Sequence, residues 1–218
     1  MKRNDLNTNQ ILFYSSEYRG LSVMENYSPL VEQYLGSLYA VMEKSFQSYR
    51  RVFAFRADLR FPEHLMMNES WVTNDAISRF IESFKAKIRN NRQCAKKLNP
   101  YAHDTVVRYA WAREVGQQGW PHYHVVFLLN RDAFCALGQF EAGRDNMFNR
   151  LQEAWASALS IPSEMATGLV HIPDNPMYHM RADDPQGISD FFYRASYLCK
   201  AQTKSFGSGQ HGFGTSRG

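Results

Sequence analysis

The chain has 218 residues, a length that suits one domain or one domain with short appendages. Hydrophobic residues make up 44% and aromatic residues 14% of it, which is enough for a core and excludes a disordered chain. The net charge of +4 is compatible with a nucleic-acid partner but does not by itself select one.

Cysteine usage and the N-terminus bear on the compartment. The three cysteines are scattered without CxxC spacing, so we expect reduced thiols rather than a disulfide framework or a zinc knuckle. The polar first residues are not followed by an apolar segment, and the sequence has no apolar run of about 18 residues. We therefore expect a soluble, cytoplasmic protein without a membrane partner.

The first third of the chain predicts an irregular segment, a helix and a strand. Residues 1–27 show no sustained period, and we expect an irregular lead-in. From Ser28 to about residue 49, apolar side chains recur every three or four residues, which predicts a helix with Ser28 as N-cap and Pro29 at its first position. Residues 51–61 alternate strictly, which predicts a strand with one wholly apolar face.

The second face of the strand at 51–61 carries Arg56, Asp58 and Arg60. One interpretation is a solvated sheet surface with an ion pair. The other is a sheet face that lines a phosphate-binding cleft, with Asp58 near a metal ion. The strand alone leaves both interpretations open.

A long helix is predicted from Thr73 to about Leu98, with an apolar stripe on one side. Its other side holds the densest group of basic residues in the chain, namely Lys85, Lys87, Arg89, Arg92, Lys96 and Lys97. Such a group is either a solvated face or a surface that contacts the backbone of DNA.

A β-hairpin follows, with strands near 105–115 and 120–129 and a glycine-rich turn at 116–119. His122 and His124 share one face of the second strand because successive side chains alternate. Glu114, near the turn, can lie across from them. One carboxylate and two imidazoles suit Mn²⁺ or Mg²⁺, or else Zn²⁺, although such histidines can also be ordinary packed or surface residues.

The last third predicts a helix at 145–159, a short strand at 169–172 and a helix at 188–204 capped by Ser189. In that last helix, spacings of four, three and four residues would stack Tyr193, Tyr197, Lys200 and Lys204 on one face. Phenols and ammonium groups make a poor core face but a good active-site face. We expect a single domain over 28–204 and a flexible Gly/Ser-rich tail over 205–218.

These residues together resemble the HUH endonuclease superfamily of rolling-circle replication initiators and nickases. More narrowly, they resemble its inovirus gene-two-protein type, including YagK/YfjJ-like members, through the segments GWPHYH (119–124), GLVHIP (168–173), RASYLCK (194–200) and FGTSR (213–217). The resemblance covers roughly residues 50–217. It implies an α+β fold with a central antiparallel β-sheet of about five strands and helices packed mainly on one face.

The resemblance also implies roles for particular residues. Glu114, His122 and His124 would bind Mn²⁺ or Mg²⁺, Tyr197 would attack the DNA to form a 5′-phosphotyrosine, and Lys200 would lie near the scissile phosphate. Tyr193 matches a second tyrosine, but Ser196 stands where the two-tyrosine pattern has Lys before its second tyrosine. The division of labour between the two phenols therefore stays open, and we favour Tyr197.

The implied partner is single-stranded or hairpin DNA at an origin or nick site. The candidate DNA-contacting residues are Arg56, Arg60, Lys85, Arg89, Arg92, Lys96 and Lys204. The sequence has no GxxxxGK(S/T) motif, so strand separation would need a helicase from the host. The nick would start the replication of a phage, prophage or satellite element, or would attack a rival's DNA. The alternatives are a non-catalytic DNA-binding protein or repressor on the same fold, and a zinc hydrolase.

Overall fold

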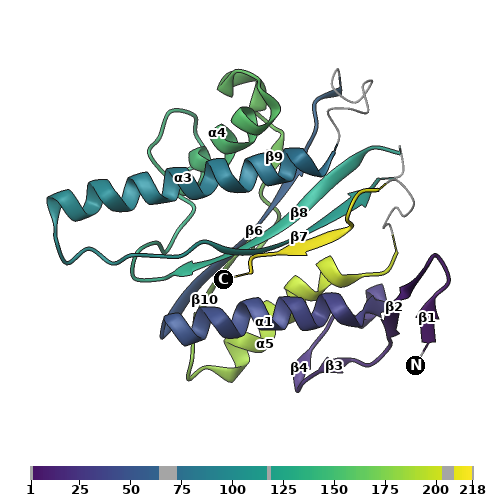
Figure 1. Cartoon of the computed structure of the whole chain (residues 1–218). Coiled ribbons are helices and arrows are strands. Elements are labelled where there is room, and N and C mark those ends of the chain that lie inside the picture. Colours follow the sequence, from purple (N-terminus) through teal and green to yellow (C-terminus); the bar gives the residue numbers. More distant parts are fainter. Residues whose placement is uncertain (1, 64–72, 117–118, 203–208, 218) are drawn as a thin grey trace.

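A central antiparallel sheet organises the chain (Figure 1). The computed structural model describes residues 2–63, 73–116, 119–202 and 209–217. Within these ranges the sheet has six strands in the order β10-β6-β8-β7-β11, with β9 also paired to β6. The strands are β6 (Arg51–Arg60), β7 (Arg108–Val115), β8 (Pro121–Asn130), β9 (Val170–His171), β10 (Met177–Arg181) and β11 (Phe213–Thr215). The predicted α+β class with a central antiparallel sheet is confirmed.

Helices cover both faces of this sheet, which differs from the prediction that they lie mainly on one face (Figure 1). One face packs on α3 (Asn74–Leu98) and α4 (Met147–Leu159), and the other on α1 (Glu32–Ser48) and α5 (Pro185–Ala195). The cause is the central strand β8, which is apolar on both sides: Phe127 faces α3, and Val126 and Leu128 face α1 and α5. Among the described residues, no helix is long and apolar enough to cross a bilayer.

The N-terminal residues form strands, so the expected irregular lead-in is wrong. β1 (Lys2–Asn4), β2 (Asn7–Phe13) and β5 (Leu30–Val31) make a small sheet, and β3 (Glu17–Tyr18) pairs with β4 (Leu21–Ser22) before the 3₁₀ helix η1 (Glu25–Tyr27). Because Leu30 and Val31 pair with β2, helix α1 begins at Glu32. Ser28 and Pro29 therefore precede the helix by several residues and do not cap it.

The helix that carries Tyr193 is shorter than predicted, and it begins and ends earlier in the chain. Helix α5 begins at Pro185, with Asp184 as N-cap accepting a hydrogen bond from the Gly187 amide at 3.0 Å. Ser189 is not a cap; its hydroxyl oxygen accepts from the amide of Ser22. Helix α5 ends at Ala195, and the 3₁₀ helix η3 (Ser196–Cys199) follows. Lys204 lies outside the described residues.

The end of the chain adds an edge strand to the central sheet. Residues 205–208 of the predicted flexible tail lie outside the described residues, but Phe213–Thr215 form β11 and pair with β7. Gly214 lies against the ring of Trp111, and a Cβ built on it would be 2.6 Å from two ring atoms. The strand can approach the indole this closely because glycine has no side chain.

We expect Gly214→Ala to destabilise the protein by about 1–3 kcal/mol, because the added methyl group would force the indole or the edge strand to move. Urea unfolding of the variant and the wild type measures the difference. Gly116→Ala is a matched control, since its Cβ would meet its nearest neighbour at an ordinary 3.5 Å. Equal stability of Gly214→Ala and wild type would contradict the contact.

Candidate metal centre

The register of the hairpin brings the three predicted metal ligands together. Glu114 pairs directly with His122, and His124 lies two residues further along β8 on the same face, opposite Ala112. This face is the one that packs on α1 and α5, because His124 lies on the same side of β8 as the buried side chains of Val126 and Leu128. Glu114, His122 and His124 form a cluster whose ligand atoms all lie within 4.8 Å of one another.

The distances in this cluster fit a shared divalent ion. His122 Nε2 lies 3.1 Å from His124 Nε2, which lies 3.3 Å from Glu114 Oε2. Two ligand atoms that are each about 2.0–2.2 Å from one ion are roughly 2.8–3.6 Å apart at octahedral or tetrahedral angles. Burial lowers the pKa of His122, and the neighbouring His124 lowers it further. A neutral imidazole with a free lone pair is the form that binds metal.

Asp58 and Arg56 contact His124 at Nδ1, the ring nitrogen that does not face Glu114. The Nδ1 of His124 lies 2.7 Å from Asp58 Oδ1, and Arg56 donates to both carboxylate oxygens at 3.0 and 3.2 Å. Arg56 also approaches Nδ1 at 2.9 Å, but a guanidinium only donates, so Asp58 is the acceptor that places the proton on Nδ1. That tautomer leaves Nε2 facing Glu114.

The charge of Asp58 is maintained by these same partners. Burial alone would raise the pKa of the Asp58 carboxyl, but the hydrogen bond from His124 and the charge and hydrogen bonds of Arg56 outweigh it and lower the pKa. The strand face carries the ion pair of the first interpretation, and Asp58 lies beside a candidate metal ligand as in the second, while phosphate binding stays a prediction. Arg56 is occupied by Asp58, which limits its predicted role in DNA contact.

We expect Asp58→Ala to weaken Mn²⁺ binding by roughly 10- to 100-fold, because His124 loses the acceptor that fixes its tautomer and ring orientation. Titration calorimetry with Mn²⁺ measures the change. Asp183→Ala is the control, since Asp183 accepts a similar two-pronged contact from Arg181 at an exposed site. Unchanged Mn²⁺ affinity in Asp58→Ala would contradict a supporting role for Asp58.

Tyr197 and Lys200 lie beside the ligand cluster. The ammonium of Lys200 donates to the Tyr197 hydroxyl at 2.6 Å and lies 2.8 Å from Glu114 Oε2. The ring of Tyr197 is 5.2 Å from that of His124, and Arg56 lies over its face at 4.7 Å. A 3₁₀ helix has three residues per turn, so the two side chains three residues apart align on one side. Lys200 is only 5% exposed.

The N-terminal segment completes this site, which the sequence did not indicate. The ring of Tyr27 packs edge-on against Tyr197 at 4.9 Å, and the Met24 amide donates to the buried Ser196 hydroxyl oxygen at 2.9 Å. The Ala201 amide donates to the carbonyl of Pro29 at 2.9 Å. These contacts join elements that are far apart in sequence, and no local sequence pattern predicts them.

Tyr193 is placed differently from Tyr197. It lies in the last turn of α5 and is 36% exposed. Among the described contacts, none joins its side chain to the metal ligands, to Lys200 or to Tyr197. The predicted stripe of tyrosines and lysines assumes one unbroken helix, whereas the backbone changes to 3₁₀ geometry at Ser196, between the two tyrosines.

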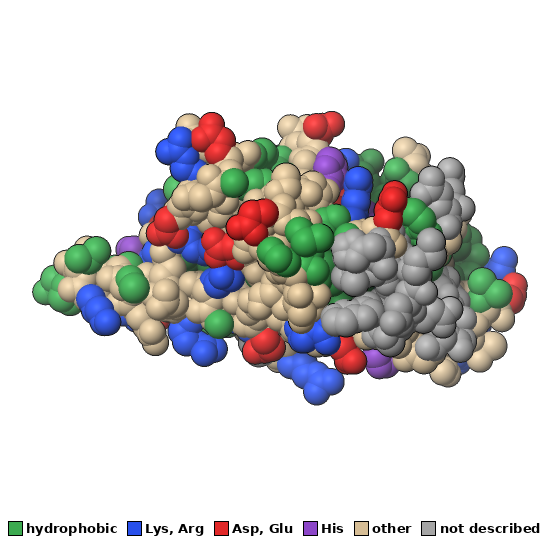
Figure 2. Space-filling model, turned by 90° about the horizontal axis from the view of Figure 1, so that it is seen from above, with side chains coloured by type: hydrophobic (Ala, Val, Ile, Leu, Met, Phe, Trp, Pro, Cys, Tyr) green, Lys and Arg blue, Asp and Glu red, His purple; other side chains and the backbone are tan. Residues whose placement is uncertain are grey.

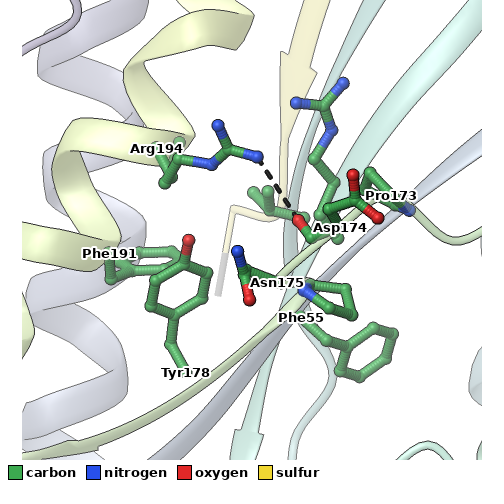
Figure 3. Close-up of a pocket in the computed structure, with 11 residues that line it drawn as sticks. Phe55, Pro173, Asp174, Asn175, Tyr178, Phe191 and Arg194 are labelled. Carbon is green, nitrogen blue, oxygen red and sulfur yellow. Dashed lines mark hydrogen bonds between the residues drawn. The ribbon is translucent and has the colours of Figure 1, made fainter.

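An open cleft of about 590 Å³ adjoins the ligand cluster. His122 and His124 line it together with Asp58, Arg60 and Trp120. Of the predicted DNA-contacting residues that the structure describes, Arg60 is therefore the one that lies exposed beside the candidate metal ligands. A second pocket, between Arg56 and Arg194, is drawn in Figure 3 and has a volume of about 10 Å³. It has room for about one water molecule and not for a nucleotide.

The basic side chains of α3 lie on the opposite face of the sheet from this cluster. Lys85 pairs with Glu82 and Lys96 with Asp104, and Arg92 donates to Asn91. Figure 2, which looks onto this side, shows basic and acidic side chains intermingled rather than one basic patch. Contact between DNA and Lys85, Arg89, Arg92 or Lys96 stays a prediction, and such contact would be remote from the metal ligands.

The fold and the site define an α+β protein whose buried Glu-His-His cluster could hold a metal ion beside a lysine–tyrosine pair. The chain belongs to the YagK/YfjJ C-terminal domain family, whose profile matches residues 13–216. It is 32% identical to "Uncharacterized protein YfjJ" of Escherichia coli (strain K12) over 86% of this chain and 95% of that protein. It is 31% identical to "Uncharacterized protein YagK" of the same strain over 78% and 85%. No solved structure matches.

Proposed function

We propose that the chain is a metal-dependent, site-specific single-strand DNA endonuclease of the HUH type. The observation that carries this proposal is the position of the Lys200 ammonium, which bridges the Tyr197 hydroxyl and the Glu114 carboxylate within 3 Å of each. A nucleophilic phenol is thereby held at the edge of a candidate metal site. A zinc hydrolase that uses water would have no need of this arrangement.

Glu114, His122 and His124 would hold Mn²⁺ or Mg²⁺. When bound, such an ion supplies positive charge that makes the phosphorus of a nearby phosphodiester more electrophilic and offsets charge in the transition state. Asp58 and Arg56 orient His124. Lys200 donates to the Tyr197 oxygen, so it stabilises negative charge on that atom as the proton leaves.

Tyr197 Oη would attack phosphorus while the bond from phosphorus to the 3′ oxygen breaks. The phenolic proton passes to water, and the departing 3′ oxygen takes up a proton to become a hydroxyl group. The product is a 5′-phosphotyrosine, which conserves the energy of the broken ester for later rejoining. No external energy source is required for cutting or for resealing.

The proposed substrate is single-stranded or hairpin DNA, because a duplex would hold the scissile phosphate away from a phenol that is half-buried beside the sheet. Strand separation would come from a host helicase in the cytoplasm. The nick would initiate rolling-circle replication of a phage, prophage or satellite element, or would attack the DNA of a rival. Arg60, beside the ligand cluster, is the best placed of the predicted DNA contacts.

The test uses a labelled pool of single-stranded oligonucleotides with a randomised core, incubated with the protein in Mn²⁺ or in EDTA. We expect a covalent protein–DNA adduct on denaturing gels in Mn²⁺ and none in EDTA, because the ligand cluster would then hold no ion. Sequencing of the attached fragments defines the cut site. DNA binding without an adduct in either condition would favour the non-catalytic DNA-binding alternative.

A further inference from the structure

The cleft beside His122 contains an exposed aromatic residue that neither the core nor the proposed nucleophile explains. Trp120 is 39% exposed and lines the cleft, and Arg60, which pairs directly with His122 across the strands, lines it too. Resting on the proposed function, we propose that this cleft binds the nucleotide on the 5′ side of the cut. Its base stacks on Trp120 and its backbone phosphate contacts Arg60.

The position of the cleft relative to Tyr197 determines on which side of the cut the bound nucleotide lies. The contacts of Tyr197 are with His124, Arg56, Lys200 and Tyr27, and neither Tyr197 nor Lys200 lines the cleft. The cleft extends from the histidines in the other direction, toward the beginning of β8. The ligand cluster therefore lies between the nucleophile and the cleft.

In-line displacement at phosphorus places the attacking and leaving oxygens on opposite sides. Attack by Tyr197 expels the 3′ oxygen of the preceding nucleotide, so that nucleotide must extend away from the tyrosine. The cleft provides the space on that side. Its volume of about 590 Å³ falls in the range of roughly 300–1,000 Å³ that small-molecule sites occupy.

The chemistry of the walls suits a nucleobase and one phosphate. Phe61 and Leu169 add apolar surface to that of Trp120, and an indole face accepts any base by stacking. Arg60 supplies a guanidinium for the phosphate. Glu63 also lines the cleft; its carboxylate would repel a phosphate but can accept hydrogen bonds from the amino groups of a base. The phosphate therefore binds at the Arg60 end.

The experiment measures the rate of adduct formation on the oligonucleotide defined by the pool, with the base immediately 5′ or immediately 3′ to the cut removed. For wild type we expect loss of the 5′ base to slow the reaction by roughly 5- to 150-fold, the range of one base-stacking contact. The Trp120→Ala variant should form the adduct with the intact substrate more slowly by a similar factor, and its rate should no longer depend on the 5′ base. Trp120→Phe should restore most of the rate.

Tyr101→Ala is the control, because Tyr101 is an aromatic residue that is 90% exposed at the far end of α3. It should behave as wild type on every substrate. If Trp120→Ala stays as sensitive to the 5′ base as wild type, or responds to the 3′ base instead, this inference is wrong while the proposed function stands. If wild type forms no adduct on any substrate, the proposed function and this inference both fail.

Discussion

Tyr197→Phe is expected to abolish the covalent adduct, with a loss on the order of 10³-fold or more, because the substitution removes the attacking oxygen. The ring contacts with His124, Tyr27 and Arg56 can persist in the variant, so the fold and the metal affinity should be retained. Gel analysis of the adduct in Mn²⁺ measures the activity, and titration calorimetry checks that Mn²⁺ still binds.

Tyr193→Phe is the matched control for this prediction. Tyr193 is exposed and has no described side-chain contact with the ligand cluster, so this variant should form the adduct at a rate close to that of wild type. A reversed result, with the adduct lost only in Tyr193→Phe, would show that the tyrosine assignment is wrong while leaving the chemistry intact.

Breaking the buried ion pair between Glu114 and Lys200 from one side is expected to destabilise the protein strongly in the absence of metal. Their side chains are only 2% and 7% exposed. Glu114→Gln leaves a buried ammonium without its counter-charge, which should lower the free energy of unfolding in EDTA by about 3–5 kcal/mol. Urea unfolding measures this quantity.

The double variant Glu114→Gln with Lys200→Met separates the charge effect from a simple packing defect. Removing the ammonium as well should recover much of the loss, so the double variant should be more stable than Glu114→Gln alone. Glu153→Gln breaks the half-exposed pair with Lys87 and should change the stability by less than about 1 kcal/mol. A stability of Glu114→Gln equal to that of wild type would contradict the buried pair.

The grouping of the candidate ligands could be predicted from the sequence because it depends on local rules. Alternation within β8 puts His122 and His124 on one face, and a short hairpin fixes Glu114 opposite them. The same alternation put Arg56 and Asp58 on one face of β6. Only the pairing of β6 with β8, which sets Asp58 opposite His124, shows that this face is the one beside the metal ligands.

The single helix predicted at 188–204 is wrong, yet Tyr197 and Lys200, which it placed side by side, do lie together. A continuous helix would have aligned Tyr193 with Tyr197, but the backbone changes to 3₁₀ geometry at Ser196. The buried Ser196 hydroxyl donates to the Tyr193 carbonyl and accepts from the Met24 amide, which ties this bend to the N-terminal segment. Lys200 still aligns with Tyr197 because three residues complete a 3₁₀ turn.

The errors at the two ends of the chain share a physical cause. Most of these strands have two or three residues, too few to show a hydrophobic period, and the seven-residue β2 begins with four polar residues and so shows no alternation. Leu30 and Val31 pair with β2, and Phe213, near the end of the chain, pairs with Ala112 in its middle. Nothing within either segment indicates these partners, so the strands could not be predicted from local pattern.

The most direct test of the account identifies the residue that is bonded to DNA. The adduct formed in Mn²⁺ is trimmed with nuclease and protease, and mass spectrometry locates the nucleotide on a peptide. We predict a 5′-phosphate linked to Tyr197. A nucleotide on Tyr193 or Tyr27, or a cut that leaves a free 5′-phosphate and no modified peptide, would contradict the proposal that Tyr197 is the nucleophile.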